Sequence, residues 1–377
     1  MTRYRYRPYV PGDEHAINEL YLAVTGRKRT VSQFMWQWQD APGGKGEIWL
    51  IEYVNDDGST KLIGHHGVMP IVFSYGQDDF LAGKTENTMV LPAFRAKILY
   101  PKYEQIFLSQ YEKRFDLLFS TLGPPAALRQ RLMQGYEAKR KWLHFEWSLC
   151  PGAFLSRLGI SCMARQEKPF FKTLGGLCIA IGKKINQFTA FIPRNSNSLP
   201  LQVLSSQEAK KHQFFAKFWD IARNSYGLTP RRNREDLAWR YWDNPYGIHT
   251  TFVYEGSKSG GCGYAIVRNI GPQIFRLEDI VIYPIDQALL EKILNTVCEW
   301  VHAQGGNILS FSTVADENKL VNFFIKFQKT NLRDKFHSFF NRNDTLMPRK
   351  LLNNTLVDSN NKIIDWYVTP FVFEGRV

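Results

Sequence analysis

The chain has 377 residues, of which 44% are hydrophobic and 14% aromatic, enough apolar material for two packed domains. It carries 48 Lys and Arg residues against 35 Asp and Glu residues, and the net charge of +13 favours anionic partners such as nucleotide cofactors, acidic carrier proteins, nucleic acid or a membrane surface. No apolar run reaches the roughly 18 residues of a spanning helix, and the five cysteines show no CxxC spacing, so we expect a soluble cytoplasmic protein with free thiols and without metal.

The beginning of the chain predicts alternating strands and helices. Residues 3–10 alternate as an edge strand does, and a helix then starts at Asp13, a candidate N-cap, and stops at Gly26. A second helix, which ends at Trp38, is rich in tryptophan. We expect three strands after it, at residues 48–54, 62–68 and 71–75.

The stretch from residue 86 to 122 predicts a strand, a loop, a helix and a second strand. The first strand is β-branched or apolar and ends at Pro92, whereas Pro101 suits a helix start because its missing N–H would have no partner there. We expect these parts, in order, at residues 88–91, 93–100, 101–113 and 117–121. A helix at 126–133 and a closing strand at 141–149 complete this half.

The second half predicts the same order of elements. Its expected strands and helices lie at residues 201–204, 206–224, 229–244, 250–254, 263–267, 278–314, 316–327 and 366–373, where 278–314 repeats the central strand, loop, helix and strand. Residues 151–198 match neither half and end in a linker-like composition. Within them, residues 170–188 are amphipathic, and they either dock on the first domain or lie on a membrane surface.

Two offsets relate the halves to each other. A shift of 192 residues places residues 86–92 on 278–284 and residues 119–122 on 311–314, and a shift of 203 places residues 35–42 on 238–245. Collinear matches of this kind predict a duplicated α/β domain. We therefore expect an N-terminal domain at 1–150, a linker or insert at 151–198, and a C-terminal domain at 199–377.

The first half resembles the GCN5-related N-acetyltransferase (GNAT) superfamily, in particular its bacterial tandem members. The motifs that carry the resemblance are Trp36, Trp38, Ala41-Pro42, Gly64-His65-His66-Gly67-Val68-Met69-Pro70 and residues 88–95. The resemblance covers both halves but not the insert. It implies two tandem GNAT-like domains, each a twisted mixed sheet with helices on both faces. More distantly, the chain is similar to the Fem-type aminoacyl transferases, which are built from two such domains.

The resemblance also implies a place for an acyl-CoA. In the family, the central strand splays from its neighbour and pairs with the pantetheine amides, and the next loop offers N–H groups to the pyrophosphate at a helix N-terminus. The matching cofactor-binding residues are Met89, Val90, Leu91, Arg95, Ala96, Lys97, Ile98 and Leu99. The loop departs from the family pattern because Ile98 and Tyr100 replace its glycine and small residue, and the second copy, at 287–290, has no basic residue or glycine. The first copy is therefore the better candidate, and both loops could also be plain turns.

The resemblance places candidate acid and base residues near the same strand. Glu86 lies near the position where many members carry a base, and its duplicate is Glu278. A residue kept in both copies can equally be a strand-end surface carboxylate. The family's tyrosine acid aligns with Arg131, so Tyr100 and Tyr136 are the nearby substitutes.

Trp36 and His65 are the predicted substrate-binding residues. His65 and His66 are neighbours on a strand, so one of them faces the interior, either as a satisfied structural residue or as a base. Splaying of the sheet predicts an acceptor cleft between the two domains.

The predicted function is transfer of an acyl group, most simply acetyl from acetyl-CoA, to an amine of a small molecule such as an amino sugar or a biosynthetic intermediate. Two alternatives stay open. One is a Fem-like transferase whose donor is an aminoacyl-tRNA or an acyl carrier protein, which suits the net charge of +13. The other is a non-catalytic scaffold in which both loops have decayed.

Overall fold

The structure is a computed structural model of the chain. It describes residues 3–97, 99–122, 125–137, 140–150, 169–188, 199–256, 260–315, 319–329, 345–350 and 366–372, with single positions between 152 and 162. Ile98 and positions 316–318, where the sequence predicts a helix start, lie outside the described residues. All five cysteines are free. Within the described ranges, no helix is long and apolar enough to cross a membrane.

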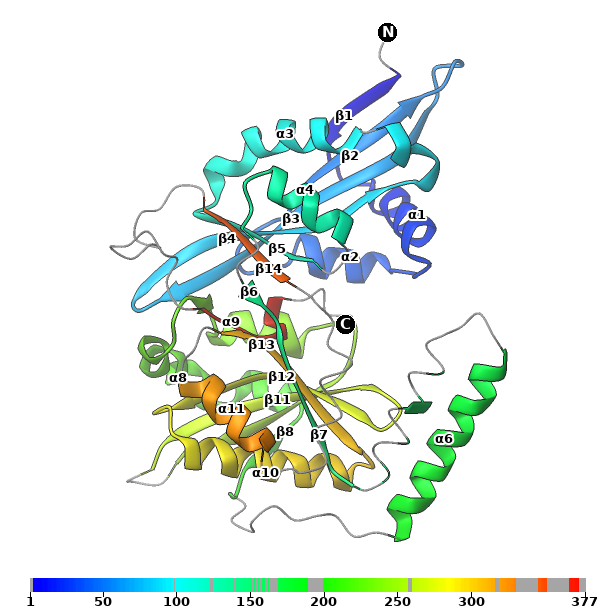
Figure 1. Cartoon of the computed structure of the whole chain (residues 1–377). Helices are drawn as coiled ribbons and strands as arrows, with labels where there is room; N and C mark the ends of the chain where they lie inside the picture. Colours follow the sequence, from blue (N-terminus) through cyan, green and yellow to red (C-terminus); the bar gives the residue numbers. More distant parts are fainter. Residues whose placement is uncertain are drawn as a thin grey trace.

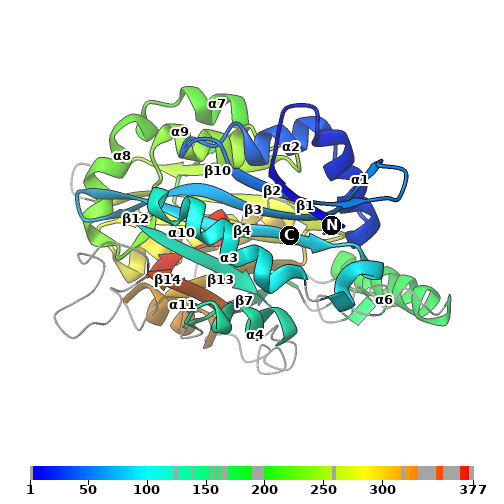
Figure 2. The same cartoon turned by 90° about the horizontal axis from the view of Figure 1, so that it is seen from above.

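The first sheet lies in the upper half of Figure 1 and has eight strands. In spatial order they are β1 (Tyr4–Pro8), β2 (Glu47–Val54), β3 (Thr60–Tyr75), β4 (Asp78–Val90), β5 (Leu117–Leu122), β14 (Thr345–Lys350) and β6 (Arg140–Lys141), with β9 (Thr229–Pro230) beside β3. Helices α1 (Glu14–Thr25) and α2 (Val31–Trp38) cover one face, and α3 (Leu99–Tyr111) and α4 (Pro125–Met133) cover the other, as Figure 2 shows from above.

The second sheet fills the lower half and repeats this plan with seven strands. Their order is β15 (Tyr367–Val368), β13 (Ile308–Ala315), β12 (Ile274–Tyr283), β11 (Cys262–Gly271), β10 (His249–Tyr254) and β8 (Gln202–Leu204), with β7 (Leu143–Ser148) on the other edge of β13. Its helices are α7 (Ser206–Lys211), α8 (Phe214–Ala222), α9 (Arg234–Leu237), α10 (Gln287–Ala303) and α11 (Lys319–Lys329). Two mixed sheets with helices on both faces confirm the predicted fold class.

The two halves are duplicates that meet across their own repeated residues. β4 pairs with β5 in parallel, as β12 does with β13, and the register Gly64↔Val90 recurs as Gly263↔Ile282. Trp36 and Trp239, which are 203 residues apart, stack with ring centroids 5.3 Å apart. Each indole N–H donates to the backbone carbonyl of the other residue, at 2.7 and 2.9 Å. The contact is therefore reciprocal, as a pseudo-twofold arrangement requires.

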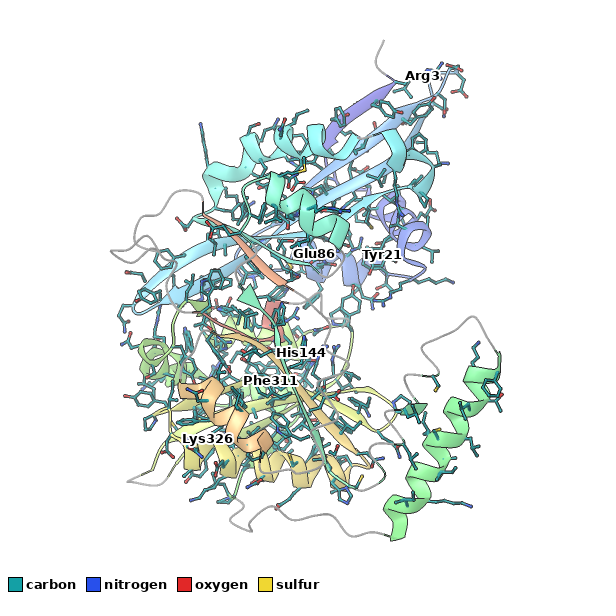
Figure 3. The ribbon with its side chains drawn as sticks, in the orientation of Figure 1. Arg3, Tyr21, Glu86, His144, Phe311 and Lys326 are labelled. Carbon is teal, nitrogen blue, oxygen red and sulfur yellow. The ribbon has the colours of Figure 1, made fainter. Side chains whose placement is uncertain are left out.

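The halves also exchange strands. The sequence predicts residues 141–149 as the closing strand of the first domain, but β7 pairs with β13 in the second sheet. Figure 3 shows His144 of β7 near Phe311 of β13. In return, β14 from the C-terminal half pairs with β5 in the first sheet. A hydrophobic pattern specifies which face of a strand is buried but not which sheet receives it, and this is why the prediction missed the exchange.

Several predicted boundaries change, among them the start of the helix predicted at 229–244, which begins at α9 after the short strand β9. Residues 62–68 and 71–75 form one strand, β3, because β2 ends opposite Val68 and the missing N–H of Pro70 therefore costs no bond with β2. α3 begins at Leu99, two residues before Pro101. Pro101 is tolerated there because the N–H groups of the first helical turn have no partner within the helix. The predicted helix 206–224 is divided into α7 and α8 at His212.

The insert contains helix α6 (Pro169–Phe188), which stands at the side of the molecule in both views. Apart from the segment around Gly159, which packs on it, α6 makes no extended contact with the strands and helices of either sheet among the described residues. The predicted docking of residues 170–188 on the first domain is therefore not what the described residues show.

Candidate active site in the first sheet

The central feature of the first sheet is an opening between β4 and β5. The two strands pair only from Ala82↔Leu117 to Lys84↔Phe119, although β4 continues to Val90. Residues 85–90 therefore have no neighbouring strand on that side among the described residues, and the resemblance predicts such a splayed edge for the strand that holds a pantetheine arm.

A β-bulge at Asn87 shapes the strand at this point. The register of β3 and β4 shifts between His65 and Gly67, and Asn87 takes a left-handed φ of 49°. After the bulge, Met89 packs against Leu20 and Tyr21 of α1. The bulge thus changes which side chains of β4 face α1 and α2.

Glu86 lies directly before the bulge, and Figure 3 shows it at the end of the first half that faces the second half. Its carboxylate forms an ion pair with Lys84, which is buried two residues earlier on the same face of β4. The side chain of Glu86 keeps some solvent exposure, and its carboxylate also accepts the N–H of Asn87 at 3.3 Å. A carboxylate that keeps some access to solvent can still receive a proton.

His65 is buried beside Glu86 and is neutral. Its Nδ1 lies 2.8 Å from the carbonyl oxygen of Asn87, which can only accept, so Nδ1 carries the proton. Burial lowers the pKa of His65 to about 3, although the bond to Asn87 opposes this shift. Nε2 is buried and has no hydrogen-bond partner among the residues that the structure describes. His65 therefore offers an acceptor atom to a polar hydrogen.

Arg29, which the sequence did not single out, connects α1 and α2 to the bulge. The guanidinium is buried and donates to Asn18 Oδ1 at 2.7 Å, to Gln37 Oε1 at 3.2 Å and to Asn87 Oδ1 at 3.0 Å. These bonds fix the amide of Asn87 and so orient the carbonyl that holds His65. The sequence does contain one indication that Arg29 matters, because the shift of 203 residues that relates the two halves places Arg29 on Arg232.

The opposite face of β4 carries a second buried polar group beneath α3 and α4. Arg131 pairs with Glu104 and donates to Thr88 Oγ1 at 3.2 Å. His66 also reaches Thr88 Oγ1, at 2.9 Å, and burial lowers its pKa well below the ordinary value. The ring of Tyr136 is buried with the Arg131 guanidinium carbon 5.3 Å from its centre. The structure thus brings Tyr136 and Arg131 together on the face opposite Glu86.

The predicted cofactor loop is a 3-10 helix at Pro92–Lys97, followed by α3. Arg95 is exposed and donates through Nε to the carbonyl of Val90 at 3.0 Å. The N–H of Leu91 donates to the carbonyl of Ile63 at 2.8 Å. Ile98 is outside the described residues, as are the side chains of four others of this loop, namely Ala96, Lys97, Leu99 and Tyr100. Trp36 is buried against Trp239.

In the second sheet, the matching opening is filled by the chain itself. β12 and β13 pair only from Ile274↔Ile308 to Leu277↔Phe311, and β15 then pairs with β13 at Val314 and Ala315. Three tyrosine hydroxyls occupy the freed edge of β12 at alternate residues. They are Tyr241 to the Glu278 carbonyl at 3.3 Å, Tyr367 to the Ile280 carbonyl at 2.7 Å, and Tyr226 to the Ile282 carbonyl at 2.9 Å. The Tyr226 hydroxyl also accepts the Ile282 N–H at 2.8 Å.

The duplicate polar residues of the second sheet are fully neutralised. Asp279 replaces Asn87 and binds Arg232 at 2.9 Å and the Tyr264 hydroxyl at 2.7 Å. Glu278, the duplicate of Glu86, is buried between Arg268 and Arg276, which approach it to 2.8 and 2.7 Å. Burial raises the pKa of Glu278, but the two guanidinium groups outweigh that effect and lower it to about 2. The second sheet therefore holds a structural ion cluster where the first has an opening.

Among the described residues, no group of three His, Cys, Asp or Glu side chains could hold a metal ion. Comparison with protein families finds no matching family model, and comparison with curated proteins finds no matching sequence.

Solved structures do match along most of the chain. A conserved Enterococcus faecalis protein described as a probable N-acyltransferase has a TM-score of 0.56 at 10% identity, covering 93% of this chain and 73% of its own. A GCN5-related N-acetyltransferase from Anabaena variabilis has a TM-score of 0.51 at 10% identity, and the match covers 93% of this chain and 73% of that protein.

The N-myristoyltransferase of Saccharomyces cerevisiae with bound myristoyl-CoA has a TM-score of 0.54 at 11% identity, with 96% and 83% covered. At such identities the likeness concerns the fold alone. The chain therefore has the fold of the GCN5-related N-acetyltransferase superfamily, present in two tandem copies.

Proposed function

We propose that the protein is an acyltransferase that moves an acyl group from a CoA thioester to an amine, with a single donor site between β4 and β5. The observation that carries this proposal is the contrast between the openings. The first has a bulged, splayed strand without a pairing neighbour in the described chain, whereas β15 and three tyrosines occupy the second.

The donor would lie along β4 with its pantetheine amides against residues 88–91. Arg95 is exposed beside the end of the strand, where a guanidinium can pair with a phosphate. N–H groups of the loop at residues 96–99 and the start of α3 would add to this binding. The yeast neighbour binds myristoyl-CoA, so we extend the proposed donors from acetyl-CoA to longer acyl-CoAs.

The chemistry needs the amine, the thioester and two proton carriers in place. The amine attacks the thioester carbonyl, the carbon–sulfur bond of the tetrahedral intermediate breaks, and an amide and a thiolate result. We assign the proton from the amine to Glu86, directly or through a water, and the proton to the thiolate to Tyr136. Tyr100 keeps the same proposed role as an alternative to Tyr136.

The acceptor would enter from the face of β4 that carries Glu86 and His65. The neutral Nε2 of His65 can accept a hydrogen bond from an amine or hydroxyl of the acceptor. Trp36 is left out of this site because its indole N–H and one ring face are committed to Trp239. A small-molecule amine is the proposed acceptor class.

Calorimetry and thermal melting with CoA, acetyl-CoA and myristoyl-CoA test the proposal. A thioester at 100 times its Kd should stabilise the protein by about 2.7 kcal/mol. Arg95→Ala should weaken binding about tenfold, since a charge-assisted hydrogen bond contributes about 1.5–3 kcal/mol. The control is Gln287→Ala, 192 residues on in the second copy, which should leave affinity unchanged.

Other outcomes would contradict the proposal. Steeply salt-dependent binding of tRNA without any response to a thioester would favour the Fem-like alternative. No response to tRNA, acyl carrier protein or thioester would favour a scaffold.

A further inference from the structure

Helix α6 presents an apolar stripe to solvent. Phe170, Leu177 and Ile181 are 69%, 56% and 42% exposed, and their spacing places them on one side of the helix. Leu158, from the segment that contacts α6, is also exposed. Exposed apolar side chains that gather along one helix mark an interaction surface rather than ordinary solvent-facing residues.

The other side of α6 accounts for how the helix is held. Gly175, Cys178 and Gly182 are buried, and Gly159 approaches so closely that a Cβ added there would lie 2.5 Å from the Gly175 carbonyl oxygen and 2.7 Å from Ile179 Cγ1. The small residues therefore allow the preceding segment to pack tightly on α6. Leu177 and Ile181 lie outside this contact and are exposed.

The insert is strongly basic. Residues 151–198 contain one carboxylate, Glu167, and seven cationic residues, namely Arg157, Arg165, Lys168, Lys172, Lys183, Lys184 and Arg194. Lys172 and Lys184 are exposed on α6 itself. The insert thus combines an excess of cations in its sequence with an exposed apolar stripe on α6, and this combination complements a surface that is both anionic and apolar.

We propose that α6 binds the surface of an anionic bilayer, lying parallel to it with Phe170, Leu177 and Ile181 among the upper acyl chains and its lysines at the lipid headgroups. A lipid surface satisfies both the stripe and the charge at once, whereas an apolar protein groove would satisfy only the stripe. This role goes beyond the proposed acyl transfer and stands independently of it.

Co-sedimentation of the full chain with vesicles tests this directly. We expect binding to vesicles that contain phosphatidylglycerol, much weaker binding to phosphatidylcholine alone, and weakening with salt as the charges are screened. The double variant Leu177→Ser with Ile181→Ser should lower the partition coefficient roughly tenfold or more. Its melting temperature should not change, because both side chains point to solvent.

Two further variants sharpen the experiment. Ile248→Ser removes an 86% exposed side chain from the second half and should bind vesicles as the wild type does. Lys172→Gln with Lys184→Gln should reduce the preference for phosphatidylglycerol. The proposal is overturned if the wild type ignores anionic vesicles, or if the Leu177 and Ile181 variant binds them equally well. It is also overturned if that variant changes only self-association in sedimentation velocity, since α6 would then be a protein contact.

Discussion

The two openings lie at matching places in the two sheets and differ in what fills them. Both central strands are bulged and leave their parallel neighbour after a few residues. In the second sheet, β15 and the hydroxyls of Tyr226, Tyr241 and Tyr367 occupy the edge. In the first sheet, Arg131 binds Thr88 on one face of the central strand, and α1 packs against Met89 on the other face.

The difference teaches how a duplicated site can become structural. An exposed strand edge needs a partner, because buried N–H and C=O groups without hydrogen bonds are costly. A bound thioester can supply those bonds in one copy, and fixed tyrosines supply them in the other. The acidic residue at the bulge follows the same division, since Glu86 has Lys84 beside it whereas Glu278 lies between two arginines.

The largest expected effect is on catalysis and concerns Glu86. Glu86→Gln removes the proposed base and should lower the rate of acyl transfer by about 10²–10⁴-fold, with donor affinity nearly unchanged. The measurement is thiol release from an acyl-CoA with an amine that supports turnover. An unchanged rate would show that Glu86 is only the partner of Lys84.

The second effect concerns stability. Glu278→Gln leaves Arg268 and Arg276 buried without their carboxylate and should lower the free energy of unfolding by about 3–5 kcal/mol. Glu86→Gln should cost less, because the Glu86 carboxylate is partly exposed whereas that of Glu278 is buried. Urea denaturation of both variants compares them, and equal losses would mean that the copies are not divided in this way.

Acid should destabilise the native protein through its buried histidines. Burial lowers the pKa of His65 to about 3 and that of His249 to about 4. As the pH falls below the ordinary value of 6.5, both histidines therefore become protonated in the unfolded chain while they stay neutral in the native protein. Glu278 adds to the loss only below its ordinary value of 4.5. His65 alone should cost about 2 kcal/mol on going from neutral pH to about pH 5. His65→Gln should reduce the slope over that interval, and an unchanged slope would mean that His65 is not held neutral.

The smallest effect tests the tyrosines of the second opening. Tyr226→Phe leaves the N–H and the carbonyl of Ile282 without their shared partner and should cost about 1–3 kcal/mol of unfolding free energy. The affinity for acyl-CoA should not change, because the proposed donor site is the first opening. A gain in the number of bound thioesters per chain, counted by native mass spectrometry, would contradict that assignment.

Much of this fold follows from the sequence. The β-branched strand at residues 88–91, the following helix and the shifts of 192 and 203 residues predict a duplicated mixed sheet, and the structure has one. The exchange of β7 and β14 was not predictable, because both strands carry patterns that suit either sheet. Long-range polar contacts were also out of reach. Arg29 and Asn87 are 58 residues apart, and no local periodicity connects them.

Hydrogen–deuterium exchange with and without a saturating acyl-CoA tests the central claim most directly, because it reports on the backbone of both openings in one experiment. The account predicts added protection at residues 86–91 of β4 and at the start of α3, with residues 278–283 of β12 unchanged. Protection of β12, or of neither strand although the thioester binds, would contradict it.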